Sequence, residues 1–369
     1  METLRWTQTM FTISGNCLNL HTYAPLQRIL YNIYVKIGMV FLYVLCIAQI
    51  LDIILNVENQ NEFTENFAIT STVFMIALKF IMISTRRVNI LILIEQLDKD
   101  LFSPVTKQEI KIRSEFDKII EWTTKAYTMI LGFFACGMFL ATIAIDFKGR
   151  KLVSRIWTPY NYSSTSSYLL TNAYEFISAI FAVSVSIACE TLYAALLLHI
   201  CCQFEILQHR FKTLDGQENY MVNQCASHHH QIYMFARRVN SEFKGIVSCQ
   251  FFTSMSVLCL NLYQMTNSEK LSMCMKSVLY SICVFSQIFY YCFYGNVVTE
   301  KSTDFPDVIF GSDWPSWNDS SKKILLMVIR RSRVPVEFTS MHVVSLNLKS
   351  FMSLLKTSYS AFNLMQTGR

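Results

Sequence analysis

The stretch of residues 342–365, HVVSLNLKSFMSLLKTSYSAFNLM, decides how the rest of the chain is interpreted. It is long enough for a helix across a bilayer core, which takes about 20 residues, but it is unusually polar for that purpose. At 3.6 residues per turn its polar side chains fall on one arc: Ser345, Lys349, Ser353, Lys356, Ser360 and Asn363. Such an arc must meet water, a pore or polar partners. Taken alone, the stretch fits a membrane helix with a wet face or a soluble amphipathic helix.

Composition favours the membrane helix. The 369 residues are 52% hydrophobic and 16% charged, whereas a soluble domain carries about 25% charged residues. The net charge of +6 is spread among polar segments, without the compact basic cluster that binds nucleic acid. The 12 cysteines lie mostly within apolar runs, where they serve as small apolar fillers. Residues 1–369 are therefore expected to form one polytopic membrane unit.

Seven segments have the length and hydropathy of membrane spans. They cover residues 31–55, 67–84, 126–147, 168–200, 245–265, 271–294 and 342–365. Residues 88–102 are expected to continue the second helix beyond the membrane, and residues 203–243 to form a polar loop of helical pattern. Residues 295–341 are expected to be a polar connection with a helical period at 323–331. The predicted fold class is an all-α membrane protein, seven transmembrane helices with long cytoplasmic extensions.

The distribution of basic residues predicts the orientation. With the N-terminus in the cytoplasm, about two thirds of the 32 lysines and arginines fall in cytoplasmic segments, as the positive-inside rule requires. Seven spans then put the C-terminus outside, a topology inverted relative to a G-protein-coupled receptor. The N-glycosylation sequon at Asn161 would lie outside and carry a glycan, whereas the sequon at Asn318 would lie inside.

Two blocks near the C-terminus carry a family resemblance. The first resembles the closing signature of insect odorant receptors through Leu348, Phe351, Leu354, Leu355, Lys356, Ser358, Tyr359, Ser360 and Phe362. The second resembles that family's run from the sixth helix into the following loop through Tyr294, Gly295, Asn296, Glu300, Ser302 and Trp314. The related gustatory receptors end in Thr-Tyr followed by Gln-Phe, and this chain lacks that pattern. Before Tyr168 the resemblance is mostly one of hydropathy.

The resemblance implies a ligand-gated cation channel subunit that binds volatile odorants in the plasma membrane of olfactory sensory neuron dendrites. In that family a tuning subunit, which this chain resembles, assembles with a shared odorant receptor co-receptor, and four seventh helices surround a central pore. No cofactor is implied. Two alternatives stay open: a gustatory-type receptor that forms its own homomeric channel, and a transporter. A transporter would show internal repeats and broken spans, and the sequence shows neither.

The resemblance also directs attention to a ligand pocket between the second to sixth spans, towards the outside. Such a pocket is expected to be an apolar enclosure with few polar groups. The candidate odorant-binding residues are Phe74, Met138, Tyr174, Ile177, Phe181, Leu258 and Tyr280. For each of them, ordinary packing is the alternative interpretation.

Two interpretations of the seventh span differ in which face meets the pore. Composition turns the serine and lysine arc toward a wet lumen, because charge needs water. The resemblance to the co-receptor instead points to a face near the outer end. There the candidate pore-lining residues are Ser358, Phe362, Met365 and Gln366. We adopt this second face as the prediction, because channels often close by a hydrophobic ring that dewets.

No arrangement of side chains in the sequence indicates catalysis or a metal site. The histidines at 228–230 lie near Cys225, but neighbours on a helix point about 100° apart and cannot share one ion. No Ser-His-Asp set or Gly-rich phosphate loop is present, so an enzyme is not expected. Of two carboxylates in the fourth span, Glu175 is expected to reach water. Glu190 is expected to make a structural polar contact, with a ligand contact as the alternative.

Overall fold

The computed structural model describes residues 4–17, 23–146, 150, 152–214, 219–267, 271–340 and 344–367, most of which are helical. The α-helices are α1 (Arg5–Ile13), α2 (Pro25–Leu55), α3 (Gln60–Thr85), α4 (Arg87–Gln96), α5 (Lys107–Asp146), α6 (Thr165–Thr213), α7 (Asn219–Asn267), α8 (Leu271–Phe310), α9 (Asp319–Ser332) and α10 (Leu348–Thr367). The described residues also include the 3-10 turns η2 (Asp100–Phe102) and η3 (Trp314–Ser316) and the antiparallel strands β1 (Thr339–Ser340) and β2 (Val344–Ser345). The predicted all-α class is confirmed.

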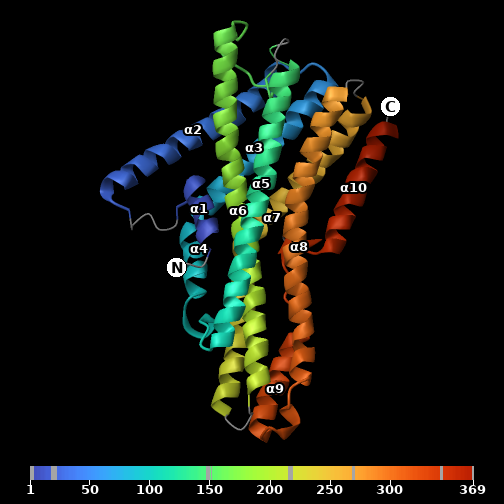
Figure 1. Cartoon of the computed structure of the whole chain (residues 1–369). Helices are drawn as coiled ribbons and strands as arrows, with labels where there is room; N and C mark the ends of the chain where they lie inside the picture. Colours follow the sequence, from blue (N-terminus) through green and yellow to red (C-terminus); the bar gives the residue numbers. More distant parts are fainter. Residues whose placement is uncertain are drawn as a thin grey trace.

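The long helices α5, α6, α7 and α8 run along the length of the molecule (Figure 1). α6 packs against the other three and also against α1, α2 and α3. α2 lies on one side of the bundle, and α3 packs against α2, α6 and α7. α10 lies on the other side, against α7 and α8 (Figure 1). At 1.5 Å per residue the 49 residues of α6 span about 74 Å. This length exceeds a bilayer core of about 30 Å.

α6 forms the centre of the bundle because it is apolar on every side. Its side chains are buried without a break from Ser184 to Phe204, and a helix that is hydrophobic all round belongs in the interior. The most apolar window of α6 is 89% buried, whereas that of α2 is 28% buried. α2 therefore presents most of its apolar surface outward, as a helix in contact with lipid does.

Beyond the predicted spans, the bundle continues at the end where α9 lies (Figure 1). We call this part the helical extension and define it as the described residues of 87–125, 201–244 and 295–333. The helical pattern predicted for 203–243 is confirmed by α6 and α7, and the helical period predicted for 323–331 is confirmed by α9. The rest of the polar connection predicted for 295–341 is more helical than expected, because α8 continues to Phe310. α8 continues across Pro306 because Phe305 and Ile309 pack into the core on either side of it.

Six helices of the described chain, α2, α3, α5, α6, α7 and α8, are long and apolar enough to cross a membrane. α10 is the seventh helix of the predicted set and is 20 residues long. Its predicted start is wrong, since residues 344–345 form β2 and the helix begins at Leu348. The predicted continuation of the second helix over 88–102 is also wrong. The helix breaks at Arg86, which lies between α3 and the separate helix α4. The Arg86 guanidinium donates to the Ser241 carbonyl of α7 at 3.1 Å. Positions 147 and 342–343 lie outside the described residues.

A glycine on α8 sets the position of α10. A Cβ at Gly295 would lie 2.4 Å from the carbonyl oxygen of Leu346, so only glycine lets the segment before α10 lie directly on α8. The same segment is held by the Leu346 amide, which donates to the Phe338 carbonyl at 2.8 Å. The chain thus turns back at the β1–β2 pair and returns to the bundle as α10.

Candidate functional site

A cavity between α3, α6, α7 and α8 is the candidate ligand site. It is lined by Thr72, Met75, Ile76, Lys79, Ser186, Gln250, Thr253, Ser254, Val257, Val284 and Gln287. Its free space is close to that of one water molecule. Most of the lining residues are polar, so this cavity differs from the apolar enclosure that we expected.

One wall of the cavity carries a buried ion pair between α3 and α6. Lys79 Nζ lies 2.8 Å from Glu190 Oε1, and the two side chains are 1% and 0% exposed. The Ser186 hydroxyl accepts from Lys79 at 3.3 Å and donates to Glu190 Oε1 at 3.1 Å. The Tyr127 hydroxyl of α5 donates to Glu190 Oε2. Both carboxylate oxygens therefore have partners, which is the condition for keeping such a charge pair in the interior.

The opposite wall, formed by α7 and α8, carries a pair of amides. Gln250 Nε2 donates to Gln287 Oε1 at 3.1 Å and to Ser254 Oγ at 2.9 Å. On the side away from the helical extension, the hydroxyls of Thr72 and Tyr280 share a hydrogen bond. The Tyr280 hydroxyl also donates to the Ala68 carbonyl of α3 at 3.1 Å. Tyr280 therefore joins α8 to α3 beside the lining residue Thr72.

The candidate odorant-binding residues do not gather at one place, and none of the seven lines this cavity. Tyr280 bonds the lining residue Thr72, and Leu258 is buried on α7. Phe74 and Ile177 are 49% and 52% exposed, and Met138 is partly buried on α5. A ligand contact by any of these residues stays a prediction.

Tyr174 and Phe181 contact α2. The Tyr174 hydroxyl donates to the Phe41 carbonyl at 3.1 Å, and the two rings lie 5.4 Å apart. The Phe181 ring lies directly over Gly38, where an added Cβ would come within 2.4 Å of a ring carbon. These two residues fasten α2 to α6, and their contact with a ligand also stays a prediction.

α10 buries the described candidate pore-lining residues. Ser358 and Phe362 are 1% and 7% exposed, whereas the side chains of Met365 and Gln366 lie outside the described ones. α10 packs against α7 and α8, with the ring of Phe351 lying 5.6 Å from that of Phe289 on α8. The exposed face carries the polar arc that composition singled out: Lys349, Ser353, Lys356, Ser360 and Asn363.

The loop before α6 folds over Glu175. This carboxylate accepts hydrogen bonds from the Val153 amide at 3.2 Å, the Ser154 amide at 3.3 Å and the Ser154 hydroxyl at 2.5 Å. The expectation that Glu175 reaches water is wrong, because the loop leaves it 2% exposed. Asn161, the predicted glycan site, lies exposed in the same loop.

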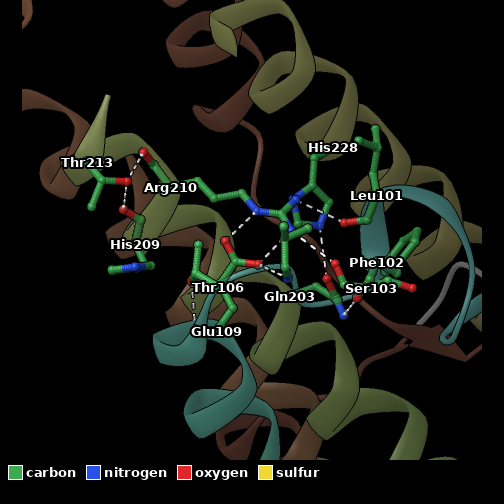
Figure 2. Close-up of polar contacts among 11 residues, drawn as sticks. Leu101, Phe102, Ser103, Thr106, Glu109, Gln203, His209, Arg210, Thr213 and His228 are labelled. Atoms are coloured by element: carbon green, nitrogen blue, oxygen red, sulfur yellow. Dashed lines mark hydrogen bonds and ion pairs between the residues drawn. The ribbon is translucent and has the colours of Figure 1, made fainter. Parts of the chain in front are cut away.

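In the helical extension, Arg210 of α6 joins three segments of the chain (Figure 2). Its guanidinium makes two hydrogen bonds to Glu109 of α5, at 3.1 and 2.9 Å, and donates to the carbonyls of Leu101 and Ser103 at 3.0 and 3.2 Å. Burial alone would raise the pKa of Glu109, but the hydrogen bonds and charge of Arg210, together with backbone hydrogen bonds at Val105 and Thr106, hold that pKa below its ordinary value. Such a two-pronged arginine–carboxylate contact fixes geometry as well as charge.

His228 of α7 completes this arrangement (Figure 2). Its Nδ1 lies 3.1 Å from an Arg210 donor, and its Nε2 lies 2.9 Å from Gln203 Oε1. This geometry requires a neutral ring that accepts at Nδ1 and donates at Nε2. Burial lowers the pKa of His228 to about 3, with further lowering by Arg210. Its neighbour His229 bonds Ser332 of α9 instead, at 3.0 Å, so the adjacent histidines serve separate structural contacts.

Lys79, the partner of Glu190, is a residue of the candidate site that the sequence analysis did not predict. A signal was available, because a lysine within a predicted span must pair with something and Glu190 was the other charge near mid-span. The sequence carried no comparable signal for the contact between Gln250 and Gln287. The two residues lie on different helices, and a glutamine has no charge that requires a partner.

These features define a polytopic helical membrane protein with a polar site in its interior. The chain matches the family model described as 7tm Odorant receptor over residues 59–359. The protein therefore belongs to the insect odorant receptor family.

Two relatives and a solved structure agree with this assignment. Odorant receptor 46a, isoform A, of Drosophila melanogaster is 24% identical over 354 residues, which cover 92% of this chain and 91% of that protein. Odorant receptor 10 of Aedes albopictus is 30% identical over 172 residues, covering 44% and 46% of the two chains. The structure of the insect olfactory receptor OR5 from Machilis hrabei in complex with eugenol matches with a TM-score of 0.84 and 16% identity, covering 99% of this chain and 98% of that chain. At that identity the likeness establishes the shared fold.

Proposed function

We propose that the chain is the tuning subunit of a ligand-gated cation channel, which opens with an odorant receptor co-receptor when a volatile odorant binds. Membership of the odorant receptor family, combined with a polar cavity enclosed by four helices, supports this proposal. The place of action would be the plasma membrane of olfactory sensory neuron dendrites, and no step of this function is enzymatic.

Contacts between the cavity and α10 offer a route from ligand to pore. Gln287 lines the cavity, and Phe289, two residues further along α8, packs against Phe351 of α10. A shift of α8 on ligand binding would therefore be transmitted directly to α10. Such coupling requires the ligand to bind the open arrangement more tightly than the closed one.

α10 would line the pore with its exposed face. Since Ser358 and Phe362 are packed against the rest of the subunit, burial favours the serine and lysine arc as the surface that meets the lumen. This choice differs from the face that we predicted from the sequence.

The test is expression of the chain with and without the co-receptor, while ionic current is recorded during exposure to a panel of volatiles. The proposal predicts odorant-evoked cation current only when the two are expressed together. Robust current from this chain alone would favour the homomeric, gustatory-type alternative. Uptake of a solute without ionic current would favour a transporter.

A further inference from the structure

We propose that the place where α1 meets α5 binds the headgroup of an anionic phospholipid, with Arg5 and Lys118 as the cations that hold it. We call this surface the α1–α5 junction and define it by Arg5, Trp6, Lys118, Glu121, Trp122 and Lys125. The inference concerns how the protein sits in lipid, so it does not depend on the proposed channel function.

One face of α5 changes from charged to apolar along its length. At 3.6 residues per turn, this face carries Lys118, Trp122, Lys125, Met129, Phe133 and Leu140. The last three lie in the predicted third span and are 68%, 73% and 67% exposed. An exposed apolar stripe of this kind on a predicted span is a surface that contacts lipid. The face therefore passes from hydrocarbon to headgroups near Trp122, one turn before the span.

Two tryptophans lie at this crossing. Trp122 is 70% exposed, and Trp6 of α1 is 38% exposed. α1 packs against α5 and α6 beside the middle of the bundle (Figure 1). Tryptophan is enriched where a membrane meets water, because its ring is apolar and its N–H is a hydrogen-bond donor. The two rings therefore place the α1–α5 junction at the level of the headgroups.

Contacts between the two helices bring Arg5 to the charged end of this face. Lys125 Nζ lies 4.3 Å from the centre of the Trp6 ring and 2.6 Å from Glu121 Oε1. The pKa of Glu121 is lowered by its hydrogen bond with Lys125, and further by Trp6 and by the charge of Arg5. Both α1 side chains thus lie beside the same carboxylate of α5.

The charge of the junction selects an anionic lipid. Its three cations face one carboxylate, and the side chains of Arg5 and Lys118 are exposed. Further from the span on the same face, Lys111 and Glu115 carry opposite charges four residues apart and add no net charge. Basic side chains next to a bilayer attract anionic headgroups. A phospholipid would place its phosphate at Arg5 and Lys118 and its acyl chain along the apolar part of the face.

The first experiment tests the depth of the junction. The purified full chain is placed in nanodiscs of phosphatidylserine whose acyl chains carry bromine, which quenches the fluorescence of tryptophans that touch the lipid. The double variant Trp6→Phe/Trp122→Phe is expected to lose most of the quenching seen in the wild type. Equal quenching of the two proteins would overturn the placement of the junction at the headgroups.

The second experiment measures the preference for brominated phosphatidylserine over brominated phosphatidylcholine in discs that contain both lipids. The wild type is expected to prefer phosphatidylserine at least about tenfold at low salt, and the preference should fall as salt screens the charges. Arg5→Gln/Lys118→Gln should bring the ratio close to one, and Lys118→Gln alone gives the same comparison if the double variant does not fold.

The matched control is Lys323→Gln/Arg330→Gln. It removes the same two charges from exposed positions of α9, at the far end of the helical extension (Figure 1), and should keep the wild-type ratio. A wild-type ratio close to one would overturn the assignment of an anionic lipid. An unchanged ratio in the junction variants, or an equal loss in the α9 variant, would overturn the site.

Discussion

Lys79 of α3 and Glu190 of α6 form an ion pair of 2.8 Å, although 111 residues separate them and neither side chain is more than 1% exposed. Breaking such a pair leaves one charge buried without its partner, which costs about 3–5 kcal/mol. We therefore expect Lys79→Met to lower the melting temperature of the purified chain sharply. The double variant Lys79→Met/Glu190→Gln should recover much of the loss.

Lys99→Met is the control for the Lys79→Met variant. Lys99 pairs with Glu95 at 3.0 Å, but its side chain is 63% exposed, and exposed pairs contribute little to stability. Its melting temperature should stay near that of the wild type. A Lys79→Met variant that melts like Lys99→Met would show that the buried pair is not formed.

Gly38→Ala should destabilise the protein, because the new methyl group would lie 2.4 Å from the Phe181 ring, which joins α2 to α6. Overpacking of this kind costs about 1–3 kcal/mol. Gly132→Ala is the matched control, since a Cβ there meets nothing within 4 Å, and alanine favours a helix over glycine by about 0.5–1 kcal/mol. Thermal melts of the two variants should shift in opposite directions, and equal shifts would contradict the contact between α2 and α6.

Acid should loosen the helical extension through its buried histidines. The pKa of His228 is lowered from 6.5 to about 3 and that of His229 to about 4, mainly by burial. As pH falls below 6.5 the unfolded chain takes up protons that the folded chain refuses, so stability falls by up to about 1.4 kcal/mol per pH unit for each histidine. The pKa of Glu109 lies below its ordinary value of 4.5, so protonation of this carboxylate lowers stability only at a lower pH than the histidines do.

Melting temperatures between pH 7.5 and pH 5 test this prediction. His228→Gln should flatten the dependence on pH, even if it lowers the melting temperature overall. His230→Gln should leave the slope unchanged, because His230 is exposed on the same helix. A slope that is equal in all three proteins would exclude His228 as a cause.

The pore face of α10 can be mapped with single cysteines. Under the proposed function, Ser353→Cys and Ser360→Cys on the exposed face should react with water-soluble thiol reagents and reduce the current. Ser358→Cys and Phe362→Cys on the buried face should react slowly. The reverse pattern of reaction would favour the hydrophobic constriction that the resemblance to the co-receptor implies.

Glycan mapping tests the orientation. Asn161 lies exposed in the loop before α6, whereas Asn318 begins α9 and accepts from the Ser321 amide at 2.8 Å. With the N-terminus inside, Asn161→Gln should abolish the mobility shift caused by glycosidase, and Asn318→Gln should leave it intact. A glycan on Asn318 would reverse the predicted topology.

The sequence by itself determined the helical class, the long apolar segments and the family of this protein. Span length and hydropathy are local properties that the thickness of a bilayer selects directly, so the apolar segments could be located without knowledge of their neighbours. The same local reasoning required a polar contact for Glu190, because a charge in a membrane span needs a partner. It misjudged Glu175, whose partners lie in a loop that folds back over the helix.

Only the tertiary structure decided which residues meet. The rotation of each long helix about its axis depends on packing against several others, and hydropathy does not specify that rotation where a helix such as α6 is apolar on every side. The rotation brings Lys79 to Glu190 and Gln250 to Gln287, and it turns Tyr174 and Phe181 toward α2. The rotation of α10 was likewise not specified by its sequence pattern. In the structure α10 packs against α7 and α8 with the face that carries Ser358 and Phe362, and both side chains are buried.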